Sequence, residues 1–250
     1  MERVVLVTGG ASGIGFATAR VLGQRGWRIG LIDRDVGALG RAAATLGAAS
    51  AAADVADEAS IAAAVAALAD TLGAPSGLVN SAGIAADIPA MDTEAEHFRR
   101  ILDVNVLGSF LAARAAARLM MAAGGGAIVN IASVSGLVGN LGRVAYGASK
   151  AAVLQMTRVL AVEWAEAGIR VNAVAPGPVE GPLVETVQAS TPRAMWTAAL
   201  PLHRYAAPEE IATTIAFLLD PDQSGFVTGA CLPVDGGFTA GGLIRPDHAP

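Results

Sequence analysis

The chain reads Thr8-Gly9-Gly10-Ala11-Ser12-Gly13-Ile14-Gly15 between its first expected strand, residues 3–7, and its first expected helix, residues 14–25. Glycine lacks a Cβ, so this loop allows a ligand to approach the backbone closely. The first turn of the following helix adds free N–H groups and a favourable dipole. A glycine-rich turn between a strand and a helix is the arrangement that holds the pyrophosphate of a dinucleotide. The stretch therefore predicts a nucleotide site on an α/β sheet.

Strand-like and helix-like segments alternate along the rest of the chain. Strands that are apolar on both faces and separated by helices predict a parallel sheet covered on each side. No internal repeat or linker-like composition shift occurs. We therefore expect one domain, residues 1–250, with a Rossmann-type doubly wound parallel sheet, helices on both faces and a substrate lid at about 178–207. Further strands are expected at 27–32, 49–53, 77–79, 127–132, 169–175 and 231–234, and helices at 36–46, after Asp57, at 93–121, at 145–167 and from Pro208.

Composition narrows the class of protein. The 250 residues carry a net charge of −5 and a single cysteine, Cys231. The charge gives no reason to expect a nucleic acid or an anionic membrane as partner, and a lone cysteine suits a reducing cytoplasm. No uninterrupted apolar run approaches the ~18 residues of a membrane span, and no secretory signal is recognisable. The three histidines, His97, His203 and His248, are scattered, so we expect no metal site.

Asp33 ends the second expected strand, eighteen positions after Gly15. A carboxylate there can accept hydrogen bonds from both hydroxyls of the adenosine ribose and repels a 2′-phosphate, which favours NAD over NADP. Two observations leave alternatives open: an aspartate can instead cap a turn, and Arg34, the next residue, can meet a phosphate.

Tyr146 and Lys150 stand four residues apart in Tyr146-Gly147-Ala148-Ser149-Lys150, one turn along a helical face. Free tyrosine has a pKa of about 10, and a nearby cation favours the phenolate. Ser133 precedes this pair by thirteen residues and follows the fifth expected strand, at the sheet edge where such folds bind ligands. Ser135 is a less favoured substitute for it.

The spacing Gly-x-x-x-Gly-x-Gly, together with Ser133 and the Tyr146/Lys150 pair, resembles the standard branch of the short-chain dehydrogenase/reductase family over nearly the whole chain. The resemblance implies that Tyr146 is the acid/base on the substrate oxygen and that Ser133 positions this oxygen. It implies that Lys150 lowers the pKa of the tyrosine and holds the nicotinamide ribose. Asn105 matches the asparagine that supports a proton-relaying water chain.

The resemblance also implies a set of cofactor contacts. Asp54-Val55 resembles the adenine contact, and Asn80-Ser81-Ala82-Gly83 resembles the family's Asn-Asn-Ala-Gly. Ser12 stands where NADP-preferring relatives often carry a basic residue. The residues expected to contact the cofactor are Gly9, Ser12, Gly13, Ile14, Gly15, Asp33, Arg34, Asp54, Val55, Asn80, Ala82, Gly83, Tyr146, Lys150, Pro176, Gly177 and Val179.

Relatives usually carry threonine at the position of Gly181, so a hydroxyl contact to the cofactor is absent and we expect a more mobile loop. The pocket for the substrate is the least defined part. Apolar residues of the lid and two polar residues before Tyr146 are candidates for it, although packing and a surface ion pair are the ordinary fates of such residues. The candidates are Leu183, Val187, Met195, Trp196, Asn140 and Arg143.

These observations predict an NAD-dependent oxidoreductase that transfers a hydride between nicotinamide and a secondary alcohol or ketone. Its expected partners are a small-molecule substrate and, by family analogy, three further copies in a homotetramer. The alternatives are an NADP-dependent carbonyl reductase of the 3-oxoacyl-carrier-protein reductase type and a non-catalytic dinucleotide sensor. A sugar-nucleotide epimerase is less favoured because such chains are usually longer. A sensor has no use for Tyr146 and Lys150 together with Ser133.

Overall fold

The sheet of this protein has seven strands, all paired in parallel, in the order β3-β2-β1-β4-β5-β6-β7. The computed structural model describes residues 3–181, 184 and 193–241. The order reverses at β1 and β4, where neighbouring crossovers leave in opposite directions, and such a switch point is where open α/β sheets bind ligands. The strands are β1 (Val4–Thr8), β2 (Arg28–Asp33), β3 (Ala49–Ala52), β4 (Gly77–Asn80), β5 (Gly126–Ile131), β6 (Ile169–Pro176) and β7 (Cys231–Val234).

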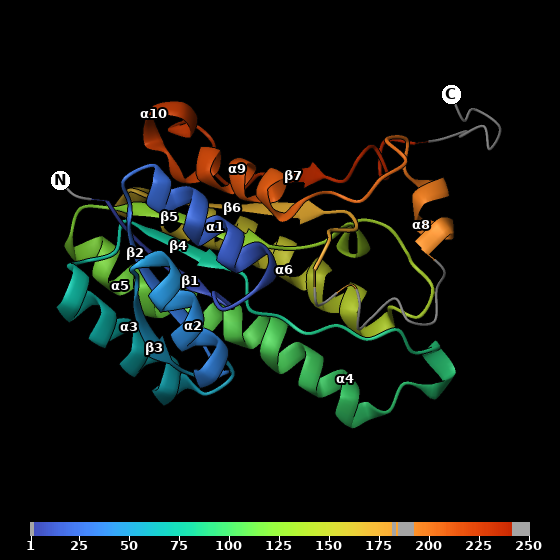
Figure 1. The fold of residues 1–250 in the computed structure, drawn as a ribbon, viewed down its shortest axis with the longest axis horizontal. Helices are drawn as coiled ribbons and strands as arrows, with labels where there is room; N and C mark the ends of the chain where they lie inside the picture. Colours follow the sequence, from blue (N-terminus) through green and yellow to red (C-terminus); the bar gives the residue numbers. More distant parts are fainter. Residues whose placement is uncertain (1–2, 182–183, 185–192, 242–250) are drawn as a thin grey trace.

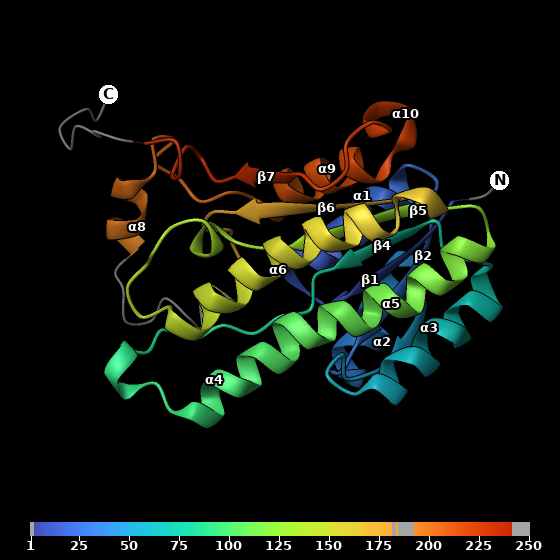
Figure 2. The same ribbon diagram turned by 180° about the vertical axis from the view of Figure 1, so that it is seen from behind.

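Helices cover both faces of the sheet, which confirms the predicted fold class (Figures 1 and 2). β1 and β4 are buried along their whole length because apolar helix faces pack on each side of them. One face carries α1 (Gly13–Gln24), α2 (Val36–Leu46) and α9 (Pro208–Leu219). The other carries α3 (Glu58–Leu72), α5 (Gly108–Ala122) and α6 (Val144–Glu163).

Local capping explains why several helices begin and end where the sequence predicts. The side chain of Asp35 accepts a hydrogen bond from the Ala38 N–H at the start of α2, and Gly47 ends that helix in the left-handed conformation. Asp57 caps α3 in the same way, and Pro208 occupies the first turn of α9. Residues of the right type at both ends therefore make these boundaries readable from sequence.

The helix expected over 93–121 is divided into three parts. α4 (Ala95–Leu102) passes into a π-helical turn, Asp103–Leu107, before α5 begins. A π turn inserts one residue into the helical repeat, and such insertions often occur at functional sites. Here the turn contains Asn105, whose side chain is fully buried. The apolar pattern runs through the insertion, so periodicity alone did not reveal it.

Two further helices lie in segments that the sequence leaves irregular. α8 (Arg193–Ala199) lies within the expected lid, and α10 (Pro221–Ser224) follows α9. Both are short, so neither has the repeated apolar face that makes a longer helix recognisable. Residues 182–183 and 185–192 of the expected lid lie outside the described residues.

The stretch Ala95–Ala122 is an exception to the expectation that no part of the chain is apolar enough to span a membrane. Over its 28 residues it is long and apolar enough to cross a membrane by length and composition. Charged residues such as Arg114 and Arg118 interrupt this stretch, so it contains no long uninterrupted apolar run. Half of its most apolar window is buried inside the structure.

Candidate active site at the carboxyl edge of the sheet

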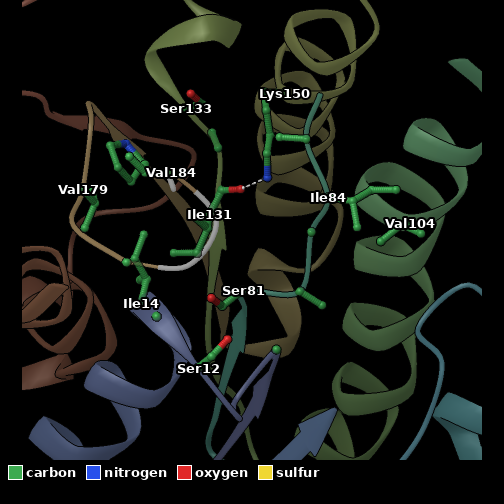
Figure 3. A pocket seen from close by; sticks show the side chains of 18 of the residues that line it. Ser12, Ile14, Ser81, Ile84, Val104, Ile131, Ser133, Lys150, Val179 and Val184 are labelled. Carbon is green, nitrogen blue, oxygen red and sulfur yellow. Dashed lines mark hydrogen bonds between the residues drawn. The ribbon is translucent and has the colours of Figure 1, made fainter. Parts of the chain in front are cut away.

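A cavity of about 540 Å³ runs along the carboxyl ends of the strands, from the glycine loop after β1 to the segment after β6. Its volume lies within the range of sites for small molecules and cofactors. Figure 3 shows side chains from both halves of the sheet converging on it, with Ile14 and Val179 on one side and Val104 and Ile84 on the other. The fold therefore provides a ligand site at the predicted edge.

The glycine loop is built so that side chains do not fit. A Cβ on Gly15 would lie 2.2 Å from the carbonyl oxygen of Gly9, and a Cβ on Gly9 would lie 2.7 Å from the Ala82 nitrogen. Ser12, the residue before α1, makes no capping hydrogen bond with its side chain, which leaves the first turn of the helix to a ligand. The arrangement fits a pyrophosphate group held by backbone N–H groups.

Gly15→Ala is expected to weaken NAD⁺ binding by about 10–100-fold, because the loop must move and lose one or two charge-assisted hydrogen bonds of about 1.5–3 kcal/mol each. A calorimetric titration measures the change. Gly40→Ala in α2 is the matched control, since a Cβ there meets nothing within 4 Å. Equal dissociation constants for the two variants would contradict the proposed role of the loop.

The carboxylate of Asp33 has two roles in the structure. It lines the cavity together with Arg34, Asp54 and Val55. It also accepts hydrogen bonds from the Ala11 N–H at 3.2 Å and the Asp35 N–H at 3.1 Å. Asp33 therefore caps a turn, as the alternative interpretation predicted, and it also lines the cavity. Its hydrogen bond from Ala11 holds the carboxylate next to the glycine loop.

All the predicted cofactor contacts line the cavity except Gly15, which packs beneath Gly9, and Asn80. Asn80 is buried, and its Nδ2 donates to the Ser109 carbonyl oxygen and to Asn130 Oδ1, each at 2.9 Å. Asn130 in turn donates to Thr157 Oγ1 at 2.9 Å. Asn80 therefore belongs to a buried polar chain that joins β4 and β5 to the helices behind them. Its predicted contact with the cofactor stays a prediction, because Asn80 does not line the cavity.

Three of the four predicted catalytic residues line the cavity: Ser133, Tyr146 and Lys150. Ser133 Oγ accepts a hydrogen bond from the Ser135 N–H at 3.1 Å, and the Ser133 side chain lowers the pKa of Tyr146. Lys150 Nζ donates to the Ile131 carbonyl oxygen at 2.7 Å, as Figure 3 shows, and lies 5.7 Å from the centroid of the Tyr146 ring. The wall of the cavity thus carries a phenol, a hydroxyl and a buried amine within one region.

Burial raises the pKa of Tyr146, and the Ser133 hydrogen bond and the Arg143 charge oppose that rise. Burial also lowers the pKa of Lys150 to about 8. The expectation from the family was that Lys150 supplies the charge that lowers the pKa of Tyr146. In the protein alone that charge comes from Arg143, whose guanidinium carbon lies 5.9 Å from the ring centroid. The tyrosine is therefore a neutral phenol near pH 7.

Asn105 lies behind the cavity wall. Its Oδ1 accepts from the Ile84 N–H at 2.8 Å, and its Nδ2 donates to the Ile84 carbonyl oxygen at 2.9 Å and to Ser149 Oγ at 3.0 Å. Ser149 Oγ donates to the Tyr146 carbonyl oxygen at 2.7 Å. Both amide hydrogens of Asn105 are thus used to tie the loop after β4 to α6, the helix that carries Tyr146 and Lys150.

The segment after β6 reaches the cavity through Pro176, Gly177 and Val179, as predicted. Gly181 has a φ of +142°, a conformation that residues with a side chain rarely adopt. Threonine in this position would be strained, so Gly181→Thr would not simply restore the hydroxyl contact that relatives have. The glycine at position 181 therefore has two effects: it allows this backbone conformation, and it leaves the position without a hydroxyl group.

The candidates for the substrate pocket are residues that line a cavity, residues that do not, and residues outside the described part of the chain. Arg143 and Trp196 line a second cavity beside the first, whereas Met195 is 62% exposed. Asn140 donates to Ser135 Oγ at 3.0 Å. Leu183 and Val187 lie outside the described residues. Among the described residues, no group of three or more His, Cys, Asp or Glu side chains is placed to hold a metal ion.

Comparison with known proteins shows the class to which this fold and site belong. A family model described as enoyl-(acyl carrier protein) reductase matches residues 9–239. A cis-4-hydroxycyclohexanecarboxylate dehydrogenase of Sinomonas cyclohexanicum is 45% identical over 244 residues, which cover 96% of this chain and 97% of the relative. A galactitol 2-dehydrogenase (L-tagatose-forming) of Cereibacter sphaeroides is 47% identical over 239 residues, 93% of each chain.

A solved structure of levodione reductase superposes with a TM-score of 0.92 at 35% identity and covers 96% of this chain and 98% of its own. The chain belongs to the short-chain dehydrogenase/reductase family. It is an oxidoreductase of CH–OH groups that uses a nicotinamide dinucleotide.

Proposed function

We propose that the protein is an NAD-dependent dehydrogenase of secondary alcohols, with Tyr146 as the acid/base, and that residues 1–250 act as one nucleotide-binding and catalytic domain. The observation that carries the proposal is that Ser133, Tyr146 and Lys150 line the same cavity as the glycine loop and Asp33. The relatives named for a hydroxycyclohexanecarboxylate and for galactitol agree with a substrate that carries a secondary hydroxyl.

The site residues divide the oxidation of the alcohol into a proton transfer and a hydride transfer. Tyr146, as phenolate, accepts the hydroxyl proton, while the Ser133 hydroxyl holds the substrate oxygen in place. The bound nicotinamide supplies the hydride acceptor. The alcohol becomes a ketone, and the proton leaves Tyr146 for solvent. In the reverse direction Tyr146 donates the proton to the carbonyl oxygen.

Lys150 and Asn105 support this chemistry from behind. One N–H of Lys150 is used on Ile131, so its two further N–H groups are available for the hydroxyls of the nicotinamide ribose. Asn105 holds α6 in register with the loop after β4. The water chain expected at Asn105 and the homotetrameric, cytoplasmic state of the protein stay predictions. Sedimentation of the purified protein tests the homotetramer.

The preference for NAD rests on the Asp33 carboxylate and on the uncharged Ser12 in the cavity wall. The test is nicotinamide absorbance with NAD⁺ or NADP⁺ and a panel containing cyclohexanol, 4-hydroxycyclohexanecarboxylate and galactitol. Turnover with NAD⁺ on any member supports the proposal. Turnover with NADP⁺ alone would favour the carbonyl reductase alternative, for which the exposed Arg34 at the cavity is the relevant phosphate partner.

The pH profile of oxidation tests the proton-transfer role. Since burial holds the pKa of Tyr146 above its usual value, the phenolate fraction and kcat/KM for oxidation rise with pH across the neutral and alkaline range. The Ser133 hydrogen bond lowers this pKa, so Ser133→Ala is expected to move the rising limb to higher pH. The variant should also reduce kcat by about 10²-fold, the usual cost of one positioning donor.

Ser135→Ala is the matched control, because Ser135 follows in the same segment and its hydrogen bonds go to Ser133 and Asn140. Its rising limb should coincide with that of the wild type. A Ser133→Ala profile that also coincides with the wild type would contradict the proposed hydrogen bond during turnover.

A further inference from the structure

Arg143 is a buried cation beside Tyr146. Its residue is 8% exposed, and one guanidinium N–H donates to the Ala86 carbonyl oxygen at 3.2 Å. No ion pair joins it to a carboxylate among the residues that the structure describes. A guanidinium has five N–H donors, and a buried charge is ordinarily paired because its desolvation is costly. The bond to Ala86 is the one hydrogen bond of this guanidinium among the residues that the structure describes, so further N–H groups are available to an anion.

Trp196 on α8 provides a second donor that lacks a partner. Its indole Nε1 is buried and has no hydrogen-bond partner in the part of the chain that the structure describes. The ring packs against Phe238 with centroids 5.9 Å apart, which holds the indole in place. Buried indole N–H groups usually find a partner, so this one is available to an acceptor atom of a ligand.

Both donors line one small cavity of about 70 Å³. It shares Ser133 and Tyr146, among other residues, with the larger cavity, so it adjoins the place where the substrate oxygen would lie. Arg143 is the sole charged residue among the described residues that line it, and none of them is acidic. The local charge therefore attracts an anion next to the reacting carbon.

We infer that this cavity receives a carboxylate group of the substrate, held by the Arg143 guanidinium and the Trp196 N–H, so that the protein acts on a hydroxy acid and its oxo acid. The inference rests on the proposed function. The planar fork of a guanidinium matches the two oxygens of a carboxylate, and a single cation balances a single negative charge. The carboxylate also gives the substrate one fixed orientation relative to Tyr146.

The test compares 4-hydroxycyclohexanecarboxylate with its carboxamide, which has the same shape without the charge. The ratio of the two kcat/KM values measures recognition of the charge, and effects on Tyr146 or on the cofactor cancel because both substrates share them. The wild type is expected to favour the acid by about 10–100-fold, since a charged hydrogen-bonded pair replaces a neutral one. Arg143→Met is expected to bring the ratio close to one.

Arg143→Lys keeps the charge without the fork and should retain an intermediate ratio. Arg25→Met, which removes an exposed arginine after α1 at the opposite edge of the sheet, should keep the wild-type ratio. A wild-type ratio near one, or an undiminished ratio in Arg143→Met, would overturn the carboxylate site while turnover itself keeps the proposed function. If the wild type turns over neither the acid nor the carboxamide but oxidises another alcohol of the panel, the carboxylate site is overturned and the proposed function stands. If it turns over no compound of the panel, both the carboxylate site and the proposed function are overturned.

Discussion

Replacing Tyr146 by phenylalanine is expected to reduce kcat by about 10²–10⁴-fold, the usual contribution of a positioned acid/base. The variant keeps the ring and removes only the hydroxyl, whose pKa the Ser133 side chain lowers. Initial rates of NADH formation at saturating alcohol measure the loss. Cofactor binding, followed by a separate titration, should change far less than turnover, because the variant keeps the Tyr146 ring and leaves the glycine loop, Asp33 and Lys150 unchanged.

Tyr205→Phe is the matched control, since Tyr205 is the other of the two tyrosines in the chain and is also buried. It contacts Arg193 on α8 rather than Ser133. Its kcat should stay within about threefold of the wild type, as for most changes away from a reacting group. A Tyr146→Phe variant that turns over as fast as Tyr205→Phe would remove Tyr146 from the mechanism.

Removing the charge of Asp33 is expected to lower the preference for NAD⁺ over NADP⁺ by about 10–100-fold. Hydrogen bonds to a charged acceptor are worth about 1.5–3 kcal/mol, and the repulsion of a 2′-phosphate is lost at the same time. Asp33→Asn is the suitable variant, because it removes the charge and keeps a side-chain oxygen. This amide oxygen can still accept a hydrogen bond from the Ala11 N–H of the glycine loop.

The preference is measured as the ratio of the kcat/KM values with the two cofactors, and thermal unfolding checks that the loop is intact. Asp33→Ala adds the loss of the backbone hydrogen bonds and should weaken binding of both cofactors. If Asp33→Asn keeps the wild-type ratio, Asp33 is a structural turn residue and the preference must come from another group.

Much of the fold could be predicted because its signals are local. The bounds of α2 agree with the prediction, since Asp35 and Gly47 mark its two ends, and β7 agrees as well. The π-helical turn at Asn105 and the short α8 were missed, because an inserted residue and a single pair of turns leave the apolar pattern almost unchanged.

The sequence predicted most of the residues that line the cavity, but not the contacts that they make. Ser133, Tyr146 and Lys150 do share one cavity wall. Asn80, in contrast, faces a buried polar chain, and Arg143 is the cation whose charge lowers the pKa of Tyr146. Neither placement follows from spacing along the chain, since each depends on what packs against the residue from another element.

By itself the sequence determined the succession of strands and helices along the chain and the glycine loop. It also determined the kinds of side chain available at the carboxyl edge of the sheet. These depend on backbone freedom, capping and apolar periodicity, which act within a few residues. The tertiary structure decided which side chains meet, including the guanidinium of Arg143 and the indole of Trp196, which line one cavity. Contacts of this kind join residues 53 positions apart, and they depend on strand order, register and side-chain packing across the whole fold.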